Sequence, residues 1–170
     1  YEVGLSNSKT RMPLYINSEN IGGSSVVQGR GIFTKVIEIQ LVPLDSLSIN
    51  CDNLQLIKLD VEGHEYEALL GGQETIRKSM PLILLEQFPA DFVASNQSSI
   101  AFLSKLGYKF AWMAHDSIRQ NRTKKRAKKL INLIIRKETT FFLTDSKVPK
   151  GHYPMLIAVP PRFLEFLNLE

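Results

Sequence analysis

An apolar run that ends in acidic residues is the feature of this sequence that most constrains its fold. Residues 54–59, which read Leu-Gln-Leu-Ile-Lys-Leu, are almost continuously apolar. Asp60, Glu62 and Gly63 follow this run. Such a run favours a strand that is covered on both faces of a sheet. Because a buried carboxylate is costly unless a partner or ligand satisfies it, the run predicts a central strand with a functional site at its end.

The same pattern recurs further along the chain. Residues 82–85 are again apolar, and Glu86 ends them. Between the two runs, residues 64–79 have the apolar spacing of an amphipathic helix. Strand, helix and strand make a βαβ unit, and open α/β sheets bind ligands outside the carboxyl ends of their strands. We therefore expect Asp60, Glu62 and Glu86 to lie at one site.

The remaining sequence supplies further elements of an α/β domain. Strands are expected at residues 1–6, 11–16, 35–41, 108–113, 139–144 and 155–160, and helices at 97–106 and after Pro161. The strand at 35–41 is expected to run antiparallel to the one at 11–16. Gly71-Gly72 is expected to bend or break the helix at 64–79, and Asp45 or Ser46 can cap a short turn.

Composition limits the kind of protein more than its activity. With 44% hydrophobic and 22% charged residues, the 170-residue chain is ordinary for one globular domain with its own core. No apolar run approaches the length of a membrane span. The single Cys51 excludes an internal disulfide and is compatible with the cytoplasm, where we expect the protein.

A basic run at residues 119–137 accounts for most of the net charge of +4. It can be the solvated face of a variable insertion, or it can hold an anionic acceptor or rest on an anionic membrane surface. Nucleic acid is the least favoured partner, because no aromatic residues alternate with the basic ones. The oligomeric state is not encoded in any pattern that we recognise.

The stretch from Ile57 to Glu65 reads Ile-Lys-Leu-Asp-Val-Glu-Gly-His-Glu. This stretch resembles the central motif of the FkbM-type S-adenosylmethionine-dependent methyltransferases. Further segments that look like family elements are Leu44–Leu47, Glu65–Gly71, Pro81–Glu86, Gly107–Tyr108 and Leu156–Pro160. The resemblance covers nearly the whole chain.

The resemblance implies an α/β protein with the Rossmann-like class I methyltransferase fold, a mostly parallel sheet and an antiparallel last strand. It also implies S-adenosyl-L-methionine as the cofactor and a hydroxyl of a sugar, glycan or polyketide-like molecule as the methyl acceptor. A glycine-rich cofactor turn does not stand out, since Gly22-Gly23 and Gly29–Gly31 do not join a strand to a helix. Because the chain also starts at Tyr1, we expect a domain truncated at its N-terminus, which alone would be inactive.

The expected organisation is one partial methyltransferase domain over residues 1–170. Its parts are a strand and hairpin lead-in at 1–47, core βαβ units at 48–113, a basic variable insertion at 114–150, and the last strand with a C-terminal helix at 151–170.

The candidate catalytic residues are the three strand-end acids. Methyl transfer to a hydroxyl requires alignment of donor and acceptor and removal of a proton, which a carboxylate can assist. Asp60 is the first choice and, with Gly63, would contact the cofactor; Glu62 and Glu86 would share the catalytic work. The competing interpretations are helix capping for Asp60 and Glu62, a plain turn for Gly63, and a salt bridge for Glu86.

Glu65 and His64 are candidates for substrate binding. Glu65 could instead be a first-turn acid that the helix dipole favours, and His64 could be an ordinary surface histidine. We assign no metal, because the spacing of Asp60, Glu62 and His64 is not a strong ligand pattern. His115 and His152 have no partner that the sequence reveals.

Two other functions fit the same sequence. The Asp60-x-Glu62 pair could hold a divalent metal in a nucleotide-sugar glycosyltransferase. Alternatively, the basic run could make the chain a non-enzymatic module that binds anionic surfaces.

Overall fold

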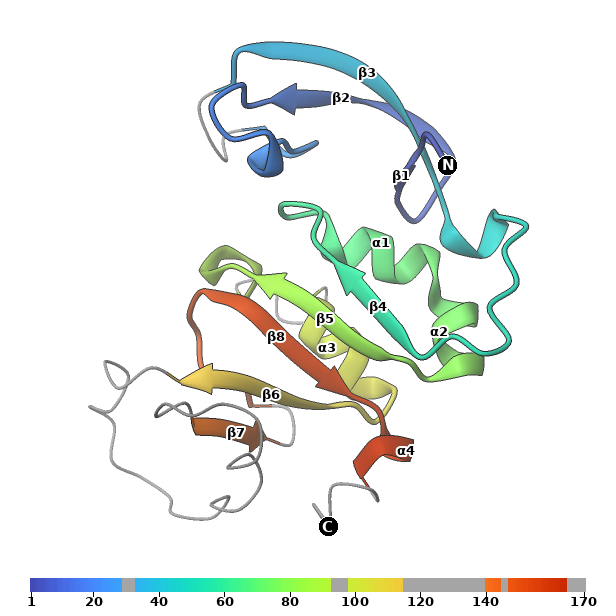
Figure 1. The fold of residues 1–170 in the computed structure, drawn as a ribbon, viewed down its shortest axis with the longest axis vertical. Coiled ribbons are helices and arrows are strands. Elements are labelled where there is room, and N and C mark those ends of the chain that lie inside the picture. Colours follow the sequence, from blue (N-terminus) through green and yellow to red (C-terminus); the bar gives the residue numbers. More distant parts are fainter. Residues whose placement is uncertain (29–32, 93–97, 115–139, 145–146, 165–170) are drawn as a thin grey trace.

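The computed structural model describes residues 1–28, 33–92, 98–114, 140–144 and 147–164, which form two sheets and several short helices (Figure 1). The mixed α/β class is therefore confirmed. Among the described residues, no helix has both the length and the apolar character to cross a membrane. A cytoplasmic location stays a prediction.

The larger sheet has five strands in the order β4-β5-β8-β6-β7. Their bounds are Leu56–Leu59 for β4, Leu82–Gln87 for β5, Lys109–Ala114 for β6, Thr140–Thr144 for β7 and Tyr153–Val159 for β8. The last strand, β8, is antiparallel to both of its neighbours, as expected.

The expectation of a mostly parallel sheet is wrong for the described strands. Within the larger sheet, only β4 and β5 pair in parallel, whereas β5–β8, β8–β6 and β6–β7 are antiparallel pairs. The reason is topological: β8 inserts between β5 and β6 and runs against both, and β7 then runs against β6.

The expectation that β4 is covered on both faces is also wrong. Leu59 is buried in the core, but Leu56 and Lys58 are exposed. In the described part of the chain β4 stands at the end of the strand order, and its buried residue faces a core shared with the helices. One face of β4 therefore meets the core and the other meets solvent.

The smaller sheet is formed by the N-terminal residues. Strand β3 (Lys35–Val42) pairs antiparallel with β2 (Thr10–Ile16), as the sequence predicted, and parallel with the short β1 (Gly4–Leu5). A 3₁₀ turn at Ile21–Gly23 follows β2. In Figure 1 the ribbon of β2 and β3 extends away from the larger sheet, while β1 contacts α1.

The helical stretch between β4 and β5 is broken into two helices, as its glycines predicted. Helix α1 spans Glu65–Gly71 and α2 spans Gln73–Ser79. A Cβ on Gly71 would lie 1.9 Å from the backbone oxygen of Ser6, so only glycine allows this close approach. Asp45, in the 3₁₀ turn Leu44–Ser46, caps α2 rather than its own turn, because its carboxylate accepts the backbone N–H groups of Glu74 and Thr75.

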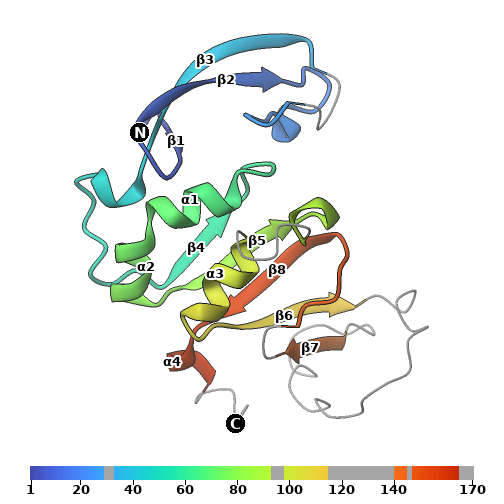
Figure 2. The ribbon, with the colours of Figure 1, turned by 180° about the vertical axis from the view of Figure 1, so that it is seen from behind.

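The core lies between the larger sheet and the helices. Its most buried side chains come from β5, β8, β6, α1, α2 and α3 (Ser99–Lys105), and include Ile83, Leu156, Phe110, Leu69, Ile76 and Leu103. Figure 2 shows α3 crossing in front of β5 and β8. The short 3₁₀ turn Pro89–Phe92 follows β5, and α4 (Pro161–Leu164) follows β8. The basic run at 119–137 lies outside the described residues.

Candidate active site

The turn that follows β4 has an unusual backbone. Glu62 has a φ of 51° and Gly63 a φ of 96°, so both are in the left-handed region. That conformation is free for glycine but costs a residue with a side chain about 1–2 kcal/mol. Backbone strain of this kind is concentrated at functional sites, where the surrounding structure enforces it.

Two hydrogen bonds hold this turn in place. The Ser25 hydroxyl donates to the backbone carbonyl of Glu62 at 2.7 Å, and the N–H of Gly63 donates to the Glu65 carboxylate at 3.0 Å. Ser25 is itself buried and bridges to Tyr15 of β2. The N-terminal sheet therefore fixes the backbone of the turn.

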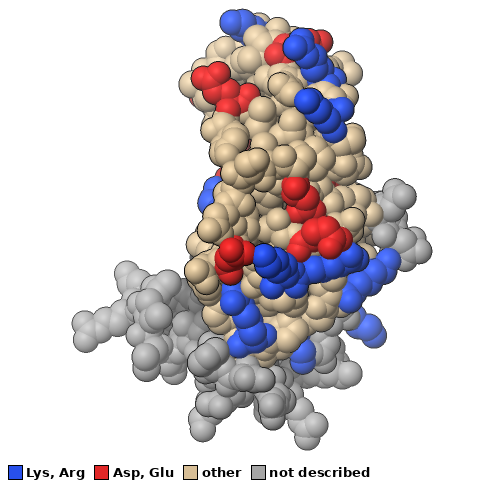
Figure 3. Space-filling model, turned by 90° about the vertical axis from the view of Figure 1, so that its right-hand side faces the viewer, with Lys and Arg blue, Asp and Glu red and all other residues tan. Residues whose placement is uncertain are grey.

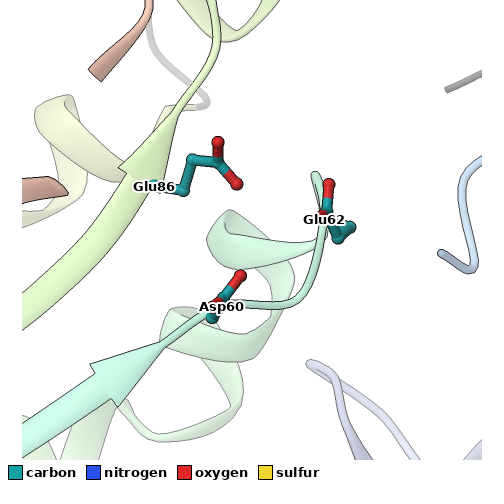
Figure 4. Close-up of side chains that lie close together, drawn as sticks. All are labelled: Asp60, Glu62 and Glu86. Carbon is teal, nitrogen blue, oxygen red and sulfur yellow. The ribbon is translucent and has the colours of Figure 1, made fainter. Parts of the chain in front are cut away.

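The three strand-end acids lie together, as the sequence predicted. One carboxylate oxygen from each of Asp60, Glu62 and Glu86 lies within 4.8 Å of the others. Figure 4 shows Glu86 projecting from the end of β5 toward the turn that carries Asp60 and Glu62. The convergence follows from the parallel pairing of β4 and β5, which brings both carboxyl ends to the same edge. The chemical roles of these residues stay predictions.

Negative charges at this spacing repel one another. Two unit charges 4.8 Å apart repel by about 1 kcal/mol in water and by about 3.5 kcal/mol at an effective dielectric constant near 20. Lys58 partly offsets this repulsion through its ion pair with Asp60, whose side chain is half exposed. The arrangement therefore favours a positively charged ligand.

Glu86 has a partner that the sequence did not reveal. Its carboxylate lies 2.8 Å from Nε2 of His152, in the loop that leads into β8. The salt-bridge interpretation of Glu86 therefore has a contact to support it. The sequence does not reveal this contact because it depends on how the strands pair. Since β8 is antiparallel to β5, the residues just before Tyr153 lie at the end of β5.

His64 is buried, so the interpretation of a surface histidine is wrong. Its Nε2 lies 3.0 Å from the Ser6 hydroxyl, and its Nδ1 lies 3.7 Å from the Glu67 carboxylate. Burial lowers the pKa of His64, and the nearby Glu67 carboxylate opposes that effect. These contacts join the lead-in segment to α1, and a role in substrate binding stays a prediction.

Glu65 is also buried, with 3% of its surface exposed, and it is the first residue of α1. The interpretation as a first-turn acid agrees with this position and with its hydrogen bond to the N–H of Gly63. Direct contact of Glu65 with a substrate stays a prediction.

A surface hollow elsewhere on the molecule has a different character. Its lining includes Cys51, Asp52, Glu74 and Lys78, which lie before β4 and on α2, at the opposite end of β4 from Asp60. Figure 3 views the side on which α2 lies and shows basic and acidic side chains next to one another. Around this hollow, Lys78 pairs with Asp52 and Arg77 pairs with Glu74, so these opposite charges offset each other.

The sequence matches a known protein family. A family model described as the methyltransferase FkbM domain matches residues 1–110. The chain belongs to the FkbM methyltransferase family. No curated protein and no solved structure matches it. The matched residues include β1 of the smaller sheet and β4 of the larger sheet, together with the turn at Glu62 and the end of β5.

The residues at the strand ends suit the methyl donor that an FkbM methyltransferase leads us to expect. S-adenosylmethionine presents positive sulfonium and ammonium groups and two ribose hydroxyls. Carboxylates complement the first two groups electrostatically and accept hydrogen bonds from the hydroxyls. Gly63, which has no Cβ and a positive φ, lets a ligand approach the backbone of the turn closely. That Asp60 and Gly63 hold the donor stays a prediction.

Proposed function

We propose that the protein is an S-adenosylmethionine-dependent O-methyltransferase that acts on a hydroxyl of a sugar, glycan or polyketide-like acceptor. The observation that carries the proposal is the convergence of Asp60, Glu62 and Glu86 at one sheet edge in a chain of a methyltransferase family. The acids arise from two strands whose carboxyl ends meet, which is where open α/β sheets bind ligands.

The chemistry asks three things of these residues. S-adenosylmethionine supplies an electrophilic methyl group on sulfur. The chain's own residues must orient the acceptor hydroxyl in line with that group, balance the donor's positive charge and receive a proton. Asp60 and the neighbouring acids can balance charge and accept hydrogen bonds from hydroxyls. An acceptor rich in hydroxyls fits this site better than an apolar one, because carboxylate oxygens accept hydrogen bonds from hydroxyls.

Two features support a Rossmann-like class I fold for the domain, which we include in the proposal. The first is the β4–α1–α2–β5 unit with parallel strands, and the second is the antiparallel β8 next to β5. The family match favours methyl transfer over the glycosyltransferase alternative. Binding of anionic surfaces by residues 119–137 stays a prediction.

Calorimetric titration of S-adenosylmethionine tests the proposal. The full-length protein is expected to bind, and the Asp60→Asn variant is expected to bind about tenfold or more weakly, because a hydrogen bond to a charged acceptor contributes about 1.5–3 kcal/mol. Titration with S-adenosylhomocysteine, which lacks the sulfonium charge, reports how much of the affinity is electrostatic.

Asp52→Asn is the matched control for this experiment. Asp52 is also exposed and also pairs with a lysine, but it lies at the other end of β4. Its variant is expected to bind like the unmodified protein. If both variants lose affinity for S-adenosylmethionine equally, the effect comes from surface charge and not from the site. If the full-length protein does not bind S-adenosylmethionine, the proposal is wrong.

A further inference from the structure

His152 and Glu86 form a pair at the edge of the proposed site. The Nε2 atom of His152 lies 2.8 Å from the Glu86 carboxylate, and the imidazole stacks on Phe88 with ring centroids 4.9 Å apart and an interplanar angle of 12°. The stacking and the hydrogen bond together fix both the position and the plane of the imidazole. The pair borders the acids, because Glu86 is also one of the three convergent carboxylates.

This geometry decides which ring nitrogen carries the proton of the neutral imidazole. An ionised carboxylate only accepts hydrogen bonds, so Nε2 must be the donor to Glu86. The lone pair of the neutral ring is then on Nδ1. Among the described residues Nδ1 has no hydrogen-bond partner, and 48% of the side chain is exposed. A basic nitrogen is therefore available to a ligand at this edge.

We propose that His152 is the general base of the methyl transfer and that Glu86 is its positioning residue, an inference that rests on the proposed O-methyltransferase function. As the acceptor oxygen forms its bond to the methyl carbon, the carbon–sulfur bond breaks and its electron pair stays on sulfur. The hydroxyl proton moves to Nδ1 of His152. The Glu86 carboxylate stabilises the imidazolium that results, and the proton then leaves to solvent.

Other groups near the site suit this role less well. Asp60 is engaged by Lys58, and a carboxylate is a weaker base at neutral pH than an imidazole. His64 is buried, and its two nitrogens face Ser6 and Glu67. Of the histidines in the described part of the chain, His152 alone combines exposure with a carboxylate that orients it.

The kinetic test uses full-length protein, S-adenosylmethionine, and the methyl glycosides of glucose, rhamnose and fucose as acceptor probes. His152→Ala is expected to lower kcat by about 10²-fold or more with little change in KM, since this is the usual contribution of a general base. Added imidazole should restore part of the lost rate. Lys150→Ala, a change in the same exposed loop, is the control and should keep the full rate. An unchanged kcat in His152→Ala overturns the proposal.

A second test does not depend on turnover. Nitrogen-15 NMR of the labelled protein reports which nitrogen of His152 carries the proton, and the expected form has it on Nε2. Glu86→Gln should shift part of the population to Nδ1–H and lower kcat, whereas Glu74→Gln, an acid on α2, should do neither. Protonation of Nδ1 in the unmodified protein, or a Glu86→Gln variant with an unchanged tautomer, overturns the proposal.

Different results refute the O-methyltransferase function and the role of His152. Absence of S-adenosylmethionine binding to the full-length protein refutes the proposed function, and the role of His152 falls with it. Binding and turnover that survive loss of the imidazole refute the role of His152 alone. If S-adenosylmethionine binds but none of the glycosides is methylated, the NMR experiment is the test. A proton on Nε2 of His152 then supports the role of His152 and Glu86, and a proton on Nδ1 refutes it.

Discussion

The left-handed backbone of Glu62 leads to a prediction that separates stability from activity. At a φ of 51°, a residue with a Cβ carries about 1–2 kcal/mol of strain. Glycine at this position removes the strain, but its greater freedom in the unfolded chain costs about 0.4–1 kcal/mol. Relative to alanine, glycine at position 62 should therefore raise the free energy of unfolding by about 0.5–1 kcal/mol.

The comparison of Glu62→Gly with Glu62→Ala isolates this effect. Both variants lose the carboxylate and its repulsion with Asp60 and Glu86, and they differ only by one Cβ. For a domain of this size, about 1 kcal/mol corresponds to a change of roughly 2–4 °C in Tm. Urea denaturation gives the free energies of unfolding, and scanning calorimetry gives the midpoints.

The same two variants should behave alike in the functional assays. Each lacks the Glu62 carboxylate, so each should lose methyl transfer to a similar extent while the glycine variant is the more stable one. Such a combination is expected where a functional site holds strain that folding does not need. If the alanine variant is as stable as the glycine variant, the strain argument is wrong; if both retain full turnover, the carboxylate is not used.

Two further predictions concern the contact between the N-terminal segment and α1. Gly71→Ala should lower the free energy of unfolding, measured by urea denaturation, by about 1–3 kcal/mol, because its Cβ would lie 1.9 Å from the Ser6 carbonyl oxygen. Gly72→Ala is the control and should be nearly neutral, since the nearest atom to its Cβ belongs to a flexible side chain at 3.0 Å. Equal effects of the two substitutions would refute the close approach at Gly71. Burial lowers the pKa of His64 below its ordinary value of 6.5. As the pH falls, His64 is therefore protonated more readily in the unfolded chain than in the folded one. The free energy of unfolding should consequently decrease as the pH drops below about 6.5. His64→Asn should flatten the profile between pH 8 and 5.5, Glu67→Gln should steepen it, and a wild-type profile without a decline would contradict the burial.

Much of the site could be predicted because its residues follow strand ends directly. Asp60 and Glu86 end two apolar runs that are separated by one helical stretch, and parallel pairing of those runs brings the two acids to one edge. The break at Gly71-Gly72 was predictable for a similar reason, since glycine disfavours a helix interior locally. These features depend on short stretches of chain.

The features that the sequence did not reveal depend on distant segments. Glu86 meets His152 only because β8 inserts antiparallel beside β5. His64 is buried because Ser6, from the N-terminal segment, lies against it. The exposed face of β4 follows from its place at the end of the described strand order, which an apolar run does not encode.

The most direct test of the central claim is an experimental structure of the full-length protein with S-adenosylhomocysteine. The product of the donor should lie beside the turn at residues 60–63, with its ribose or its sulfur in contact with Asp60 or the backbone of Gly63. Ligand density in the hollow near Cys51 and Lys78, at the opposite end of β4, would contradict the account.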